Sequence, residues 1–220
     1  MIKKMTAADV VYEQLRDDII SGKYKPGEKL SEVQLAEAYG VSRDPVRKSI
    51  SRLIQENLLI SKPQYGTIVS EVSCKQAEDI CDIRMVLETY AISIAVKNIS
   101  EEVLDFFQKE VDRIDAIIEL GDDEYVRNAV YELDGKLHHA IYDACDNSMI
   151  ANIISSYQYI IKRIQISNWM WHNRKKGTFS EMKDIISALK RRDEKAAVES
   201  MRVHILNIKK AVDLKAEKKE

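Results

Sequence analysis

The sequence predicts a mainly α-helical protein of two domains. We expect an N-terminal winged helix-turn-helix with a two-stranded β wing over residues 1–73, followed by an all-α helical bundle over residues 74–220. Glycine and proline are scarce, at seven and three of 220 residues, and this scarcity disfavours a turn-rich β fold. Apolar residues recur at helical spacing through most of the chain. The β-prone residues 58–70 lie between two helical regions.

Three helical patterns and one hairpin pattern make up the predicted first domain. They cover about residues 7–21, 32–39, 43–56 and 58–70. Gly22 follows the first helix, Ser31 opens a capping box before the second, and Gly66 supplies the hairpin turn. Two helices joined by a tight turn at Gly40 form a helix-turn-helix, and a hairpin after it is a wing.

The third predicted helix has the properties of a DNA-recognition helix. Ser42 stands at its N-cap, where the hydroxyl can accept from a first-turn N–H. The first three turns carry four cations, Arg43, Arg47, Lys48 and Arg52. Such a helix suits the major groove, and its cations suit the phosphates. Residues 1–73 carry 11 Lys and Arg against 10 Asp and Glu, so the positive charge is local, as expected of a DNA-reading face; an ordinary solvated charged face is the alternative.

From Ser73 onward, every predicted segment is helical. The helices cover about residues 74–97, 101–119, 122–145, 148–171, 179–191 and 194–216. Capping boxes at Ser73 and Thr178 open two of them, and residues 175–177 form a loop before the second. The expected inner face of the first helix consists of Ala77, Ile80, Ile83, Leu87, Tyr90 or Ala91, and Ile94.

Cysteine usage and hydropathy exclude several classes of protein. Cys74, Cys81 and Cys145 are an odd number without a CxxC pair, which argues against a disulfide framework or a zinc knuckle. The first residues lead into no apolar segment, and the longest apolar runs contain only a few residues. We therefore expect a cytoplasmic protein without a signal peptide or membrane span.

About 60 residues of the first domain resemble the DNA-binding domain of the GntR family in order and spacing. The resemblance rests on Val11–Arg16, Ile19–Leu30, Leu35–Glu37 and Gly40–Arg47. It implies a dimeric transcription factor that binds double-stranded operator DNA at a short pseudo-palindrome. It also implies that Arg43 and Arg47 reach base edges, and an arginine fork matches guanine O6 and N7.

The resemblance and the helix geometry assign further residues to the same interface. Ser42 is expected at the helix start and Gly66 at the wing tip. Lys48 and Arg52 lie further round the helix, where phosphate contacts are favoured. Asp44 replaces the small hydroxyl residue of many members, and its carboxylate can accept from cytosine N4. We therefore expect an altered sequence preference.

The second domain resembles the FadR-type C-terminal ligand-binding domain, or FCD domain, a helical bundle. The resemblance rests on Ile83–Glu88, Leu133–Tyr142, Asn147, Ile185–Leu189 and Met201–His204. Many members of this subfamily hold a divalent metal with one Asp and three His. Those positions correspond here to Asp134, His138, Met182 and His204, so methionine stands where one histidine is expected.

Two interpretations of this site remain open on the sequence. Asp134 and His138 are four residues apart on one helical face, and with His204 they suffice for zinc or a similar ion with open positions. Candidate substitutes for the missing histidine are Glu181, His139 and His172. The alternative is a metal-free polar pocket in which the same residues bind the effector by hydrogen bonds.

Two further residues are candidates for effector binding. Arg84 can grip a carboxylate with two parallel hydrogen bonds. Its alternative role is a structural pair with Glu88, one turn further along the helix. Tyr142 lies one turn beyond His138 and is either a pocket residue or a plain core tyrosine.

The resemblance implies a transcriptional regulator, which we expect to be a repressor and not an enzyme. A small organic acid, expected to be a carboxylate, would bind the helical domain of the homodimer and change its affinity for the operator. One alternative is a metal-dependent hydrolase or isomerase using Asp134, His138 and His204 with bound water. Against it, no general-base Glu stands at a spacing such as HExxH. The other alternative is an architectural DNA-binding protein with an inert dimerisation bundle.

Overall fold

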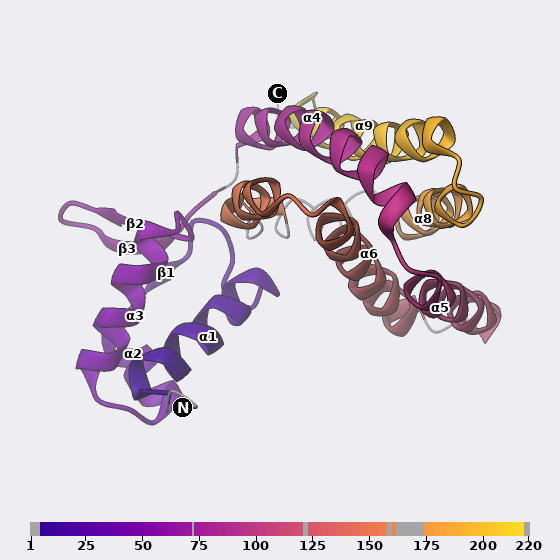
Figure 1. The fold of residues 1–220 in the computed structure, drawn as a ribbon. Coiled ribbons are helices and arrows are strands. Elements are labelled where there is room, and N and C mark those ends of the chain that lie inside the picture. Colours follow the sequence, from indigo (N-terminus) through magenta and orange to yellow (C-terminus); the bar gives the residue numbers. More distant parts are fainter. Residues whose placement is uncertain (1–4, 72, 121–122, 158–159, 162–173, 218–220) are drawn as a thin grey trace. The chain divides into compact units, whose positions relative to one another are not determined.

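The computed structural model describes residues 5–71, 73–120, 123–157, 160–161 and 174–217, and these fold into helices and one small sheet (Figure 1). The chain divides into two compact units, Met1–Val72 and Ser73–Glu220. The mainly helical fold predicted from the sequence is confirmed. Within the described ranges, no helix is both long and apolar enough to cross a membrane.

The N-terminal unit is a winged helix-turn-helix. Its elements are α1 (Ala7–Ile20), β1 (Lys29–Leu30), α2 (Glu32–Tyr39), α3 (Arg43–Gln55), β2 (Leu59–Lys62) and β3 (Gly66–Val69). The strands form an antiparallel sheet in the order β1-β3-β2, with Ile60 opposite Ile68. The short strand β1 therefore adds a third strand to the two predicted for the wing. Helix α1 packs on α3, and Leu15, Val46 and Leu53 are fully buried.

The start and end signals of the helix-turn-helix are only partly as predicted. Gly40 ends α2 in the left-handed conformation with φ of 65°, which glycine adopts without strain. Ser42 occupies the N-cap position of α3, but its side chain makes no capping hydrogen bond. That capping interaction was therefore wrongly predicted. The start of α3 is exposed, so water can satisfy its first-turn N–H groups instead.

The C-terminal unit is helical throughout its described residues. Its labelled helices are α4 (Cys74–Asn98), α5 (Glu101–Leu120), α6 (Asp123–Cys145), α8 (Lys175–Lys190) and α9 (Glu194–Glu217), and residues 148–157 form another. Helix α4 packs along α9 and also against α6, and α8 packs on α9 (Figure 1). The rest of the helix predicted to reach residue 171, together with His172, lies mostly outside the described residues.

The buried face of α4 agrees with the prediction at Ala77, Ile80 and Ala91 and differs from it at other positions. Ile83 and Tyr90 are 37% and 54% exposed, whereas Arg84 and Glu88 are 3% and 0% exposed. The prediction followed the large apolar residues, but the helix turns the Arg84–Glu88 ion pair toward His138 of α6. Burial of two charges is tolerable when they are paired and hydrogen-bonded. Arg84 and Glu88 of α4 therefore lie in the interior of the bundle.

The beginning of α8 also departs from the prediction. The helix starts at Lys175, so residues 175–177 are helical and not a loop. The backbone N–H of Thr178 donates to the carbonyl of Arg174 at 2.8 Å, as an interior helical residue does. The expected capping box is therefore absent: Thr178 lies within the first turn of the helix, and the Glu181 carboxylate binds Arg174, His204 and Asn207 instead.

Candidate functional site

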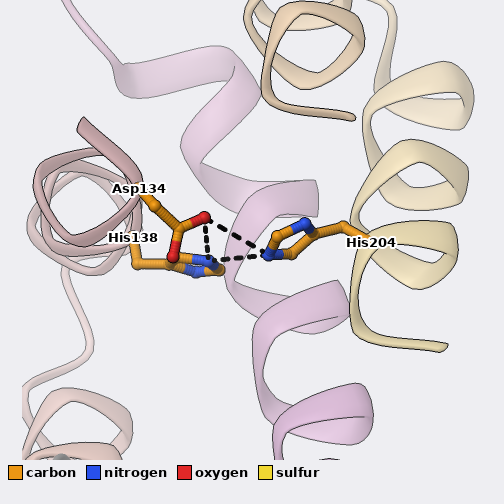
Figure 2. A group of neighbouring side chains, drawn as sticks. All are labelled: Asp134, His138 and His204. Atoms are coloured by element: carbon orange, nitrogen blue, oxygen red, sulfur yellow. Dashed lines mark hydrogen bonds and ion pairs between the residues drawn. The ribbon is translucent and has the colours of Figure 1, made fainter. Parts of the chain in front are cut away.

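Three buried side chains of the helical unit point toward one another. Asp134 and His138 come from α6 and His204 comes from α9, as Figure 2 shows. The two histidine Nε2 atoms are 3.3 Å apart. Asp134 Oδ1 lies 3.5 Å from Nε2 of His204 and 3.8 Å from Nε2 of His138. The structure thus brings together the three ligand candidates that the sequence suggested.

A carboxylate lies against the outer nitrogen of each histidine. Nδ1 of His204 is 2.9 Å from Glu181 Oε2, and Nδ1 of His138 is 2.6 Å from Glu88 Oε2, although the ring N–H is not aligned for a regular hydrogen bond. An ionised carboxylate only accepts, so both contacts favour a proton on Nδ1. Both Nε2 lone pairs then face the centre of the group, as in carboxylate–histidine–metal arrangements.

These ligand atoms fit a small divalent cation. Around a tetrahedral zinc ion with bonds of about 2.0–2.2 Å, neighbouring ligand atoms lie roughly 3.3–3.5 Å apart. The Nε2–Nε2 and Nε2–Oδ1 distances of 3.3 and 3.5 Å agree with these edges, and the remaining edge is longer at 3.8 Å. Two nitrogens and one carboxylate oxygen also match the donor preference of zinc and similar ions. The described residues therefore contain a group that could hold a metal.

Arg84 of α4 joins this group from the side. Its Nε donates to Glu88 Oε1 at 2.6 Å, and its Nη2 lies 3.3 Å from His138 Nε2. The pairing of Arg84 with Glu88, one of its two expected roles, is therefore present. Burial alone would raise the pKa of Glu88, but Arg84 and then His138 hold it well below the usual range. Glu88 is consequently an anion inside the bundle.

The same anion affects its two neighbours on α6. Burial favours neutral His138, yet the adjacent Glu88 carboxylate outweighs it and raises the histidine pKa. Tyr142 is buried, and its ring centroid is 6.2 Å from that of His138. Burial, followed by the negative charge of Glu88, raises the pKa of Tyr142 well above its ordinary value. The phenol is therefore a neutral side chain beside the group.

Glu181 is the centre of a hydrogen-bond network that spacing along the sequence does not reveal. Its Oε1 accepts from Arg174 Nη2 at 2.7 Å and from Asn207 Nδ2 at 2.8 Å, and its Oε2 faces His204. Burial raises the pKa of Glu181, but these partners together lower it, beginning with His204. Glu181 thus orients His204 from outside and is not among the inner ligand atoms.

Met182 occupies the position of the missing histidine, and His139 is a candidate substitute for it. Neither is well suited to bind the ion. Met182 is fully buried, and a thioether is a poor ligand for zinc, which prefers nitrogen, oxygen and thiolate donors. His139 is exposed and packs edge-on against Tyr142. Asp134, His138 and His204 are therefore the three protein ligands that the described residues offer.

On the N-terminal unit, Arg43 and Arg47 lie one turn apart on α3. Their side chains are 60% and 59% exposed, and both bind the Glu32 carboxylate of α2. Asp44 and Lys48 pair with each other at 2.9 Å and are exposed. The N-terminal half of α3 therefore presents cations to solvent.

Arg52 and Gly66 have additional local roles. Arg52 Nη1 donates to Asp9 at 2.9 Å, and its guanidinium lies 3.7 Å from the ring centroid of Tyr12. These contacts attach α3 to α1, so Arg52 contributes to the domain itself. Gly66 begins β3 with φ of 110°, and a Cβ there would lie 3.2 Å from Lys29 Cε. The backbone conformation at the end of the wing thus favours glycine.

The chain matches two families over most of its length. Residues 7–69 match "Bacterial regulatory proteins, gntR family", and residues 79–207 match "FCD domain". An uncharacterised HTH-type transcriptional regulator YdhC of Bacillus subtilis is 27% identical over 88% of this chain and 85% of its own. The HTH-type transcriptional repressor RspR of Escherichia coli is 26% identical over 92% of this chain and 87% of its own.

Further comparisons support the same assignment. The gluconate operon transcriptional repressor of Bacillus subtilis is 28% identical, covering 96% of this chain and 86% of its own. The solved structure of E. coli McbR/YncC has a TM-score of 0.77 at 21% identity, covering 96% of this chain and 99% of that chain, which shows a shared fold. A GntR-type helix-turn-helix implies DNA as a partner. The chain belongs to the GntR family of bacterial transcriptional regulators and carries an FCD domain.

Proposed function

We propose that this regulator is a cytoplasmic repressor that binds operator DNA as a homodimer and responds to a small organic acid. The exposed pair Arg43 and Arg47 on α3 supports base reading by the N-terminal unit. Ser42, Asp44, Lys48, Arg52 and Gly66 are the other interface residues proposed from the sequence. Both RspR and the gluconate operon protein are named as repressors, and the second is named for a gluconate operon. Gluconate is a carboxylate, which favours this class of effector.

The convergence of two Nε2 atoms and one carboxylate oxygen carries the proposal for the helical unit. Asp134, His138 and His204 would hold a divalent ion such as zinc, which would supply a Lewis-acidic position for an effector carboxylate. Arg84 lies beside His138 Nε2 and would contribute a second positive charge to that carboxylate. Tyr142 would contribute a neutral hydroxyl.

The positions of these residues suggest how the effector would influence DNA binding. Arg84, Asp134 and His204 come from α4, α6 and α9, and α4 contacts both of the other helices. An effector bound among them can favour one packing of the three helices over another. The effector can change the affinity for DNA only if it binds one of the two packings more tightly than the other. The difference between these two binding free energies limits the size of the change.

A metal-free pocket remains a second candidate because Arg84 Nη2 lies 3.3 Å from His138 Nε2. An arginine N–H donated to that lone pair would stabilise the group without an ion. Elemental analysis of protein purified with excess zinc distinguishes the two. About one zinc per chain, absent from a His204→Asn variant, supports the metal centre. Zinc-free wild type overturns it and favours the pocket.

Operator binding and its regulation are tested together. Duplexes that the wild type enriches from random-sequence DNA serve as the probe, and small carboxylates are titrated into the complex. We expect Arg43→Ala to lose discrimination between selected and random DNA, and Lys48→Ala to weaken binding to both. Equal losses on both DNAs for Arg43→Ala would contradict base reading. If none of the carboxylates changes the affinity of the protein for DNA, the architectural alternative is favoured.

A further inference from the structure

Glu32 lies between the two arginines proposed to read bases. It is the first residue of α2, and its Oε2 is 3.1 Å from Arg47 Nη2 and 3.4 Å from Arg43 Nη2. Its Oε1 also accepts from Arg47 Nε at 3.4 Å. The hydrogen bond from Arg47 is the largest cause that lowers the pKa of Glu32; burial opposes it, and the charge of Arg47 and the hydrogen bond from Arg43 add smaller lowering contributions. The carboxylate is therefore ionised at neutral pH.

Glu32 is itself held by the fold. It lies in the first turn of α2, where the helix dipole favours a negative charge. Helix α2 is anchored by the buried residues Leu35 and Ala36, and the side chain of Ser31 accepts at its N-cap. The carboxylate thus projects from a fixed element toward a neighbouring helix, which gives its two contacts a defined geometry.

The contacts leave part of the Arg47 guanidinium available. Glu32 occupies the Nε and Nη2 edge, so the donors of Nη1 and the second hydrogen of Nη2 remain for another partner. Recognition of guanine O6 and N7 requires two such donors side by side. Arg47 remains 59% exposed while it binds Glu32. Binding to Glu32 and reading a base are therefore compatible.

We propose that Glu32 is a positioning residue that sets the sequence discrimination of Arg43 and Arg47 by fixing the orientation of both guanidinium groups. A pre-oriented side chain loses less rotamer freedom when it binds its target. The Glu32 charge also repels phosphates, so an arginine that leaves the base edge for the backbone meets an unfavourable field. This proposal rests on the proposed DNA reading by the two arginines.

If Glu32 only stabilised the fold, its replacement would lower the melting temperature and not the discrimination between DNA sequences. The ion pairs are largely exposed, and such pairs contribute little to folding stability. We therefore expect Glu32→Gln to melt close to the wild-type temperature while it discriminates DNA sequences less well. The ratio of the random-DNA Kd to the selected-DNA Kd measures that discrimination directly.

The experiment compares Glu32→Gln with Glu37→Gln in the full-length protein. Glu37 lies on the same helix and is exposed, so its replacement removes the same charge away from the two arginines. Both variants should bind random DNA more tightly because each removes one negative charge. Only Glu32→Gln should lower the Kd ratio, by about fivefold to tenfold, a part of what one bidentate base contact provides. Equal ratios for the two variants would overturn the proposal.

Two further variants separate geometry from charge and from the arginines. Glu32→Asp keeps the charge but shortens the reach, so its Kd ratio should lie between those of wild type and Glu32→Gln. In an Arg43→Ala and Arg47→Ala background, Glu32→Gln should lower the ratio no further, because its targets are gone. An independent loss in that background would refute a role through the arginines.

Failure of the underlying DNA reading has its own result. If Arg43→Ala and Arg47→Ala keep the wild-type Kd ratio, the proposed reading fails, and the role of Glu32 fails with it. If both arginine variants lose discrimination while Glu32→Gln and Glu32→Asp keep it, only the role of Glu32 is overturned. Circular dichroism and melting curves of each variant confirm folding.

Discussion

Replacement of Glu181 by glutamine tests the network around His204. The carboxylate accepts two contacts at each oxygen: Arg174 and Asn207 at Oε1, and Arg174 and His204 at Oε2. Glutamine turns one oxygen into an NH2 donor that faces donors, so two of these contacts are lost whichever way the amide turns. Hydrogen bonds to charged groups contribute about 1.5–3 kcal/mol each.

The size of the effect follows from burial. The Glu181 and Arg174 side chains are only 12% and 14% exposed, so solvent screens their contacts little. We expect Glu181→Gln to lower the free energy of unfolding of the helical unit by about 3–6 kcal/mol, the sum of the two lost contacts. This corresponds to a melting temperature lower by roughly 6–24 °C for a unit of this size. Zinc affinity should also fall by about tenfold to hundredfold, because His204 loses its outer partner.

Differential scanning calorimetry and zinc titration of the full-length protein provide both readouts. Glu199→Gln is the matched control, since Glu199 is an exposed carboxylate on α9 that pairs with Arg202 one turn away. The control should melt close to the wild type and bind zinc equally well. If Glu181→Gln behaves like Glu199→Gln in both measurements, Glu181 does not support His204 and the network has been misread.

The other predictions concern the metal, the interface between α1 and α3, and acid. Met182→His should bind zinc roughly tenfold more tightly by isothermal titration, since it supplies a fourth ligand; unchanged affinity would place position 182 away from the ion. Arg52→Ala should destabilise the N-terminal unit in thermal melts, because a cation–π contact with Tyr12 contributes about 0.5–1 kcal/mol. A wild-type melting temperature would restrict Arg52 to DNA contacts. Glu88 and Glu181 have pKa values below that of the unfolded chain, 4.5. Their stabilisation is therefore complete above about pH 4.5 and is lost as the pH falls below it. Glu181→Gln should flatten that loss in acid unfolding curves; an equally steep loss would contradict the assignment.

Local capping signals and helical periodicity were sufficient to predict most helices. Ser73 and Gln76 cap each other at the start of α4 as expected, because a capping box is satisfied within four residues. The same signal at Thr178 and Glu181 misled, because α8 begins three residues earlier, at Lys175, and Glu181 binds His204 and Asn207 of α9. Local rules fail where a tertiary contact competes for the same side chain.

Only part of the site could be predicted from the sequence, for a related reason. Asp134 and His138 share a helical face by spacing, and His204 was found by resemblance. Glu88 and Glu181 contact the outer nitrogens of the two histidines across helices, and no spacing encodes such a contact. The apolar stripe of α4 was misplaced because hydropathy assigns Arg84 and Glu88 to solvent, whereas their mutual compensation allows burial.

The ionic groups around the two histidines have a consequence for competition between protons and metals. Among the residues that the structure describes there, three carboxylates (Glu88, Asp134 and Glu181) meet two guanidinium groups (Arg84 and Arg174). With both imidazoles neutral, these five described side chains together carry one negative charge. A proton on an imidazole or a divalent ion can each compensate it, and both use the same Nε2 lone pairs. Ion uptake would therefore release protons and weaken as the medium becomes acidic, so a regulator built this way would sense hydrogen ions and metal supply through a single set of atoms.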